Sequence, residues 1–147
     1  MKTLHIVAPV DLDEHSGKVI SYAAHMAEKL AANLTVLHIV EPIRAMGDMI
    51  LGSTTIEEFN AKRYSQSKEL LSKLIADCSG CGAELIVGEI VEEIVNFAEK
   101  KEADLIIIGT HGSKGIEKLL LGSVAERVVK RAPCPTLVMN PYKHHGF

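Results

Sequence analysis

Glycine and serine residues gather in one stretch of this chain, directly after its most apolar segment. Glycines there allow the backbone to approach a ligand closely and to adopt positive φ angles. A helix that starts at the end of the stretch would add free N–H groups and the positive end of its dipole, which favour a phosphate group. The residues have the spacing Gly109-x2-Gly112-x9-Gly122-Ser123. This arrangement predicts a phosphate-binding loop, with simple tight turns after a strand as the open alternative.

Other residues in the same stretch narrow the kind of phosphate site. The hydroxyl groups of Ser113 and Ser123 can donate hydrogen bonds to phosphate oxygens, and Lys114 can add positive charge. Gly122 is followed by Ser123 and Val124, so the Gly-Lys-Ser/Thr of a Walker-type loop is missing. The fingerprint G-x-G-x-x-G after a first strand is missing as well. The stretch therefore differs from the loops of P-loop NTPases and dinucleotide-binding enzymes.

Apolar, β-branched strands alternate with amphipathic helices along the chain. Strands that are almost continuously apolar are buried on both faces, which predicts a parallel sheet with helices on each side. Ser16 and Thr55 are placed to cap the first two helices, and residues 42–54, which lack periodicity, predict a mobile loop. The predicted strands are 4–10, 34–40, 84–88, 104–109 and 136–140, and the predicted helices are 16–32, 55–77, 92–100 and 122–131.

The composition is that of one average globular domain over residues 1–147. The net charge is −3, no basic tract is present, and three Phe and three Tyr are few for base stacking, so no nucleic-acid partner is expected. No apolar run approaches the roughly 20 residues of a membrane span. The first apolar run is also too short for a signal peptide, so we expect a cytoplasmic protein without a membrane partner.

The three cysteines, an odd number, do not indicate a disulfide framework. Cys78 and Cys81 form a C-x-x-C motif, which is typical of a redox pair or of half a zinc site. A zinc site needs two further ligands, and neither a second C-x-x-C nor an H-x3-5-H is present. Because the motif lies between a helix and a strand, not at a helix start, a structural role is favoured. Cys134 is expected to be a small buried residue.

The spacing of the glycine stretch, after a strand that reads Asp-Leu-Ile-Ile-Ile-Gly, resembles the ATP-binding class of the universal stress protein family. The resemblance covers almost the whole chain. Its other matching segments are Pro9-Val10-Asp11 at the end of the first strand, residues 37–40 in the second and residues 132–138 around the last. It implies an α/β fold with a single open five-stranded parallel sheet in the order 3-2-1-4-5. Such a fold is Rossmann-like and adenine nucleotide alpha hydrolase-like.

The resemblance also implies a ligand and its contacts. By similarity the ligand is an adenine nucleotide, ATP or else AMP or ADP, with Mg²⁺ held through Asp11. Val10 and Val40 would flank the adenine, and Pro9 its edge. The ribose and the phosphates would be wrapped by Gly109, Gly112, Ser113, Gly122, Ser123 and Val124. The chain departs from the family where Leu12-Asp13 follows Asp11 in place of the usual Gly-Ser or Ser, which leaves two carboxylates near the phosphates.

The implied function is an ATP-binding regulatory protein of the stress response with at most slow ATP hydrolysis, because no residue is identified that positions an attacking water. No catalytic residue is assigned. Two alternatives stay open: a metal-dependent nucleotide hydrolase or phosphotransferase that uses Asp11 or Asp13, and a nucleotide-free dimeric scaffold. A homodimer through strand 136–140 is expected, because this strand lies at the sheet edge in the order 3-2-1-4-5 and residues 136–139 carry no charge.

Overall fold

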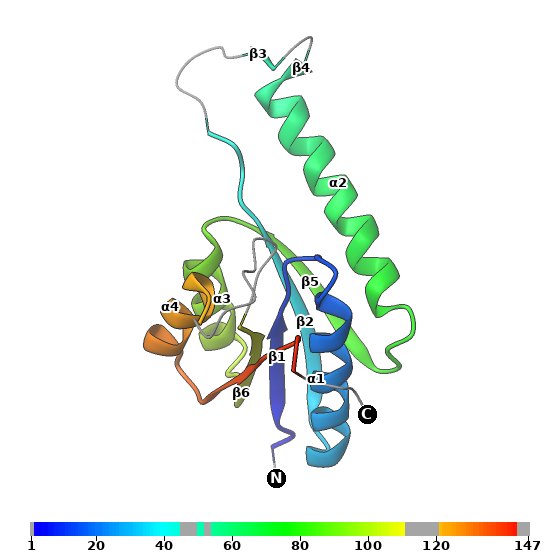
Figure 1. Ribbon diagram of the computed structural model, residues 1–147, viewed down its shortest axis with the longest axis vertical. Helices are drawn as coiled ribbons and strands as arrows, with labels where there is room; N and C mark the ends of the chain where they lie inside the picture. Colours follow the sequence, from blue (N-terminus) through cyan, green and yellow to red (C-terminus); the bar gives the residue numbers. More distant parts are fainter. Residues whose placement is uncertain (1, 45–49, 52–53, 111–120, 144–147) are drawn as a thin grey trace.

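The computed structural model describes residues 2–44, 50–51, 54–110 and 121–143. In these ranges five strands pair in parallel to form one sheet: β1 (His5–Pro9), β2 (Asn33–Val40), β5 (Cys81–Val87), β6 (Leu105–Gly109) and β7 (Thr136–Met139). Their spatial order is β5-β2-β1-β6-β7 (Figure 1). Two short strands, β3 (Ile50–Leu51) and β4 (Thr54–Thr55), form a separate antiparallel pair. With that pair set aside, the predicted order 3-2-1-4-5 is confirmed.

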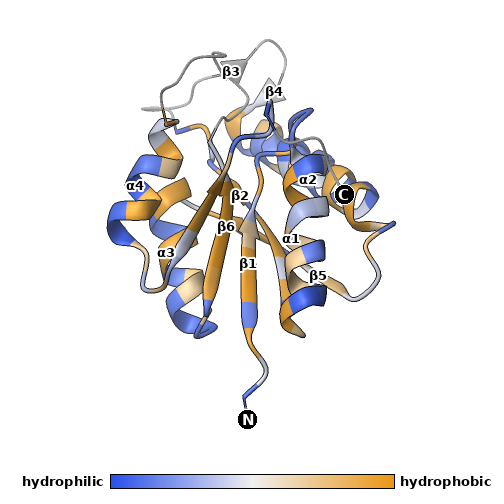
Figure 2. Cartoon of the chain, turned by 60° about the horizontal axis from the view of Figure 1, so that its bottom comes forward, coloured by the Kyte–Doolittle hydropathy of each residue, from blue (hydrophilic) through white to orange (hydrophobic). Residues whose placement is uncertain are grey.

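Helices cover both faces of the sheet (Figure 2). α1 (Ser16–Leu30) and α2 (Ile56–Ile75) lie on one face, and α3 (Ile90–Lys100) and α4 (Ser123–Arg131) lie on the other. Successive strand residues serve opposite layers: Ile6 and Ala8 of β1 pack with α1, whereas Val7 packs with the α3 and α4 layer. None of the helices in the described ranges is long and apolar enough to cross a membrane.

The start of α1 differs from the prediction that Ser16 caps the helix. His15 occupies the N-cap position without a side-chain cap hydrogen bond, and Ser16 is the first helical residue, only 1% exposed. The Ser16 hydroxyl donates to Oδ1 of Asp13 at 3.2 Å. A buried hydroxyl needs a hydrogen-bond partner, and the preceding loop supplies it, so Ser16 is not an acceptor for the helix N–H groups.

α2 begins with the cap that the sequence predicted. Thr55 Oγ1 accepts a hydrogen bond from the Glu58 backbone N–H at 3.2 Å, and the Glu58 carboxylate accepts one from the Thr55 N–H at 3.4 Å. This reciprocal pair is a capping box. In Figure 1 the N-terminal half of the helix projects beyond the sheet.

The segment that follows β2 is tied to this projecting half of α2. The Asn60 amide bonds both backbone groups of Ile43, each at 2.9 Å. Arg63 donates to the Glu41 carbonyl at 2.7 Å. Residues 42–54, predicted to form a loop, therefore include a clamped stretch and the β3–β4 pair; residues 45–49 and 52–53 lie outside the described ranges, so the predicted mobility stays a prediction.

Two elements begin two or three residues earlier than predicted. β5 begins at Cys81 because Gly82 and Ala83 continue its pairing with β2. Glycine and alanine are depleted in strands, so they carry little sequence signal for one. α3 begins at Ile90, so only Gly88 and Glu89 connect it to the end of β5.

Candidate functional site

The carboxyl ends of β1, β2 and β6 lie at one edge of the sheet, where the predicted phosphate loop begins. β1 and β6 are parallel neighbours, but the chain after β1 leads to α1 on one face and the chain after β6 leads to α4 on the other. The strand order reverses at this point, and open α/β sheets bind ligands at such switch points. The topology therefore places Gly109, the last residue of β6, and Asp11, in the loop after β1, at the same edge of the sheet.

The end of β1 is held by β2 through backbone and side chain. The Val10 N–H donates to the Leu37 carbonyl at 2.8 Å, and Nδ1 of His38 lies 2.7 Å from the Val10 carbonyl oxygen. A carbonyl only accepts, so Nδ1 carries the hydrogen. Burial lowers the pKa of His38 from its usual 6.5; the hydrogen bond to Val10 raises it, and the charge of Arg63 lowers it. His38 was not among the residues predicted for the site, and the only sign of it in the sequence is a polar residue within an apolar strand.

The two carboxylates that follow β1 have different roles. Leu12 between them has a φ of 64°, and this left-handed conformation turns the chain. Asp11 is exposed, and its Oδ1 lies 3.4 Å from the Asp13 N–H. Asp13 turns into the loop: Oδ1 accepts from the His15 N–H at 2.9 Å and from the Ser16 hydroxyl. Asp13 thus positions the start of α1, and Asp11 is the carboxylate presented to solvent.

Asp13 also has an oxygen without a partner in the part of the chain that the structure describes. Its Oδ2 is buried and has no hydrogen-bond partner within the described residues. The hydrogen bonds of Oδ1 within the loop give Asp13 a positioning role at the start of α1. The expectation that both carboxylates lie near the phosphates stays a prediction.

The start of α4 is brought back to the end of β6 by backbone hydrogen bonds. The Thr110 N–H donates to the Met139 carbonyl at 2.8 Å, which extends the β6–β7 pairing, and the Gly122 N–H donates to the Thr110 carbonyl at 2.7 Å. Gly122 is the N-cap of α4 and provides no side-chain cap for the first-turn N–H groups, and Ser123 is exposed. The positive end of α4 therefore faces the edge where β6 ends. Thr110 was not predicted either, because it acts through its backbone N–H and carbonyl groups and not through its side chain.

α4 is also linked to the N-terminus of α3. The Glu89 side chain caps α3 by accepting from the Glu92 N–H at 2.6 Å, and it pairs with Arg127 of α4 at 3.3 Å. The hydrogen bond from Glu92 is the main reason that the pKa of Glu89 is lowered, with smaller contributions from Val91 and Arg127. An ionised Glu89 thus helps to orient α4 against α3.

The structure gathers the described candidate residues at this edge, with graded exposure. Pro9, Val10 and Val40 are buried, Gly109, Gly122 and Val124 are half-buried, and Asp11 and Ser123 are exposed. The buried residues Pro9, Val10 and Val40 are called the apolar floor below, and Asp11 and Ser123 are the exposed polar residues beside them. Gly112 and Ser113, with His111 and Lys114, lie outside the described residues. Across the part of the chain that the structure describes, no three His, Cys, Asp or Glu side chains are grouped to hold a metal ion.

Comparison with known proteins gives a consistent assignment over nearly the full length. The model of the universal stress protein family matches residues 3–140. A universal stress protein from Methanocaldococcus jannaschii is 37% identical over 140 residues, which make up 94% of this chain and 82% of that protein.

Solved structures share the fold. UspA from Lactobacillus plantarum aligns with a TM-score of 0.79 at 23% identity, over 95% of this chain and 99% of that one. A universal stress protein from Archaeoglobus fulgidus, solved in complex with dAMP, aligns with a TM-score of 0.59 at 24% identity, over 93% of this chain and 97% of that one.

Proposed function

Since the chain belongs to the universal stress protein family, we propose that it binds an adenine nucleotide at the edge where β1, β2 and β6 end. The observation that carries the proposal is the N-terminus of α4, where the N-cap Gly122 has no side chain to cap the helix and Thr110 holds it beside the end of β6. The dAMP complex of the Archaeoglobus fulgidus protein supports an adenine nucleotide as the ligand class. We propose ATP, with AMP or ADP as lesser ligands.

The phosphates are assigned to the start of α4. The first-turn N–H groups of a helix have no partner within the helix, and here the N-cap is a glycine without a side chain to accept from them. A phosphate oxygen satisfies these donors and is favoured by the helix dipole. The exposed Ser123 hydroxyl adds a donor at the same place, and Gly109, Gly112 and Ser113 complete the proposed cradle.

The base is assigned to the apolar floor. Val10 and Val40 end the two central strands, and only 8% and 5% of their surfaces are exposed. Apolar surface at the end of the strands suits the flat face of an adenine. Pro9 lies one residue further back on β1 and is also buried, so we assign it to the edge of the base.

Asp11 is assigned to the ribose or to a magnesium ion. An exposed carboxylate next to a triphosphate is the donor type that Mg²⁺ uses, because this ion is usually held by one or two carboxylates plus phosphate oxygens and water. The orphaned Oδ2 of Asp13 lies in the same loop and is a further oxygen of the preferred type. When bound, the ion would neutralise phosphate charge next to these two aspartates.

The proposed role is regulatory, with at most slow hydrolysis. The sequence has no Walker-type lysine, and none of the described residues is assigned to position an attacking water. Single-turnover hydrolysis with purified protein tests this part of the proposal. A rapid phosphate burst that Asp11→Asn abolishes would favour the hydrolase alternative.

The nucleotide site is tested by calorimetric titration of ATP in the presence and absence of Mg²⁺. We expect Asp11→Asn to weaken binding roughly tenfold with Mg²⁺, because a hydrogen bond or metal contact to a charged group is lost. Glu14→Gln is the matched control, since this exposed carboxylate lies in the same loop and pairs with His15. Wild-type protein without measurable ATP binding, or equal loss in both variants, would contradict the proposal.

A further inference from the structure

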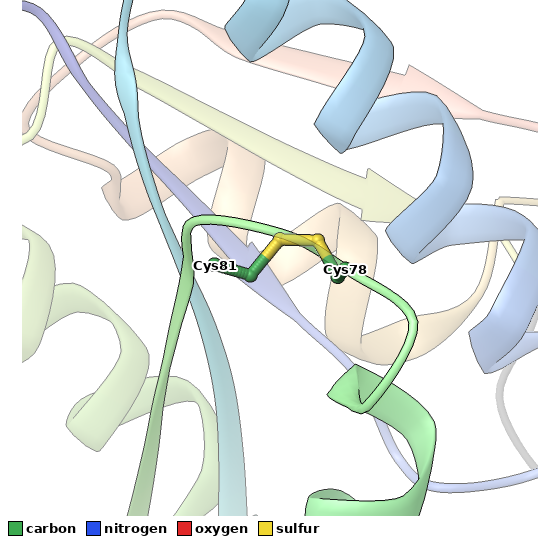
Figure 3. Close-up of a disulfide and its surroundings, with 2 residues drawn as sticks. All are labelled: Cys78 and Cys81. Carbon is green, nitrogen blue, oxygen red and sulfur yellow. A yellow bond between two sulfur atoms is a disulfide. The ribbon is translucent and has the colours of Figure 1, made fainter.

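The C-x-x-C motif is a disulfide in the structure. Cys78 and Cys81 are joined in the turn that connects α2 to β5 (Figure 3). From the sequence, the odd number of cysteines did not indicate a disulfide framework, and a redox pair was the less favoured interpretation of this motif. We propose that Cys78 and Cys81 are a reversible redox site, which exchanges electrons with low-molecular-weight thiols and disulfides of the glutathione type.

The turn itself brings the two sulfur atoms together. The Cys78 N–H donates to the Ile75 carbonyl at 2.9 Å, and the Cys81 N–H donates to the Cys78 carbonyl at 3.3 Å. Gly80, between them, has a φ of 80°, which glycine adopts at little cost. The Cα atoms of the two cysteines are 5.5 Å apart, within the range of disulfides. Because backbone hydrogen bonds and a glycine already close the turn, the two thiols of the reduced form remain neighbours.

The position of the pair separates it from the nucleotide site. Cys81 is the first residue of β5 and pairs with Leu34 near the start of β2, whereas the candidate nucleotide site lies at the carboxyl ends of the strands. Both cysteines pack against the core layer under α1 and α2. Because they are only half-buried there, a small thiol can reach them. In the described ranges no third His, Cys, Asp or Glu side chain is grouped with the two cysteines, which argues against a zinc site.

The surroundings favour a slow, stoichiometric site over a catalyst of disulfide exchange. Catalytic C-x-x-C cysteines have a thiol pKa lowered by a helix N-terminus. Here Cys78 follows the C-terminus of α2, where the helix dipole disfavours a thiolate. Cys134 does not compete, because it lies in the opposite core layer, where burial and the nearby Asp104 carboxylate raise its pKa.

The exchange is balanced without a metal or a cofactor. One cysteine thiolate attacks a sulfur of oxidised glutathione, forming a mixed disulfide and releasing one glutathione thiolate. The thiolate of the other cysteine then attacks the protein-side sulfur, closing the Cys78–Cys81 bond and releasing the second glutathione. The two protons lost by the cysteines end on the two released glutathione molecules, and reduction runs the same steps in reverse.

The test is thiol trapping across glutathione buffers that range from fully reduced to fully oxidised. Wild-type protein is equilibrated in native buffer, quenched in acid, unfolded and labelled with a maleimide before mass spectrometry. We expect two species that interconvert: one with three labelled cysteines, and one in which Cys134 alone is labelled. Three labels in the most oxidising buffer, a single label in the most reducing one, or separate glutathione adducts on both cysteines would each overturn the proposal.

Two variants assign the reaction to this pair. Cys134→Ser should keep the transition at the same buffer ratio. Cys81→Ser should lose it and retain a glutathione adduct on Cys78, because no neighbouring thiol remains to displace the adduct. If Cys134→Ser abolishes the transition, the assignment to Cys78 and Cys81 is wrong. The wild-type result stands by itself, so the test does not depend on the fold of Cys81→Ser.

Discussion

His38 joins β2 to the end of β1, next to the proposed adenine floor. Its ring is neutral near pH 7, because burial lowers the pKa below the usual 6.5. In the unfolded chain the same ring would take up a proton near 6.5. Folding stability therefore falls as pH decreases from about 6.5 toward the lower folded pKa, since the unfolded state binds more protons in that interval.

The test for His38 is a comparison of urea unfolding at several pH values between 7.5 and 5.0, for wild type and His38→Asn. The asparagine amide can donate to the Val10 carbonyl but does not titrate. We expect the wild type to lose more stability than the variant as the pH falls below about 6.5. The other six histidines and the carboxylates are the same in both proteins, so parallel curves would contradict the role of His38.

At the residue scale, sequence patterns predicted where the candidate side chains lie better than how those side chains are held. Asp11 and Ser123 are exposed at the expected edge. The use of Asp13 and Ser16 to build the start of α1 could not be predicted, because it depends on the left-handed turn at Leu12. A pattern of residue types does not specify that turn.

At the scale of elements, α2 is the helix that depends most on its local signals. Leu71 is its buried residue, and the half near Thr55 projects from the sheet. Helices without much packing rely on caps and side-chain pairs, and here the capping box and the links from Asn60 and Arg63 to the preceding segment serve this purpose. The predicted cap was correct because a capping box is encoded by neighbouring residues.

Replacing Thr55 tests this dependence. Thr55→Ala should cost about 0.5–2 kcal/mol of helix stability, because the Glu58 N–H loses its acceptor. Since the start of α2 projects from the sheet, we expect the loss of helix stability to appear as faster hydrogen exchange at the Glu58 and Phe59 amides. The free energy of global unfolding should change little. Thr55→Ser keeps the hydroxyl and should exchange like wild type; equal fraying in both variants would show that the cap is not responsible.

The parallel sheet was predictable because apolar strands alternate with helices along the chain, whereas its strand order was implied by the resemblance to the universal stress protein family. The early start of β5 was not predictable from the sequence, because Gly82 and Ala83 are poor strand formers and join the strand only through pairing with β2. The start of α3 at Ile90 was missed for a related reason. Its cap is Glu89, a residue type that is not among the preferred N-caps.

At the scale of the whole molecule, β7 is an uncharged strand at the sheet edge. The described part of the tail leads away from it: Pro141 is buried, its carbonyl accepts from Lys18 at 3.1 Å, and the Tyr142 ring packs edge-on against His15 near the start of α1. We propose that β7 pairs with its symmetry mate in a homodimer, because such an edge is self-complementary across a twofold axis.

Sedimentation at micromolar concentration measures this association. We expect a species near twice 16.0 kDa, and we expect Val138→Lys to shift it toward the monomer with circular dichroism retained. Ala83→Lys is the control, because Ala83 is exposed on β5, the other edge strand. A monomeric wild type would show that this dimer does not form. A dimer that only Ala83→Lys disrupts would place the interface away from β7.

The central claim is that an adenine nucleotide binds at the carboxyl edge of the sheet, and backbone amide NMR during an ATP titration with Mg²⁺ tests both binding and location. We predict saturable shifts that are largest at Asp11, Val40, Gly109 and residues 122–124, and negligible at Cys78 and Cys81, at the opposite end of β5. Spectra that do not change at saturating ATP, or shifts centred away from this edge, would contradict the account.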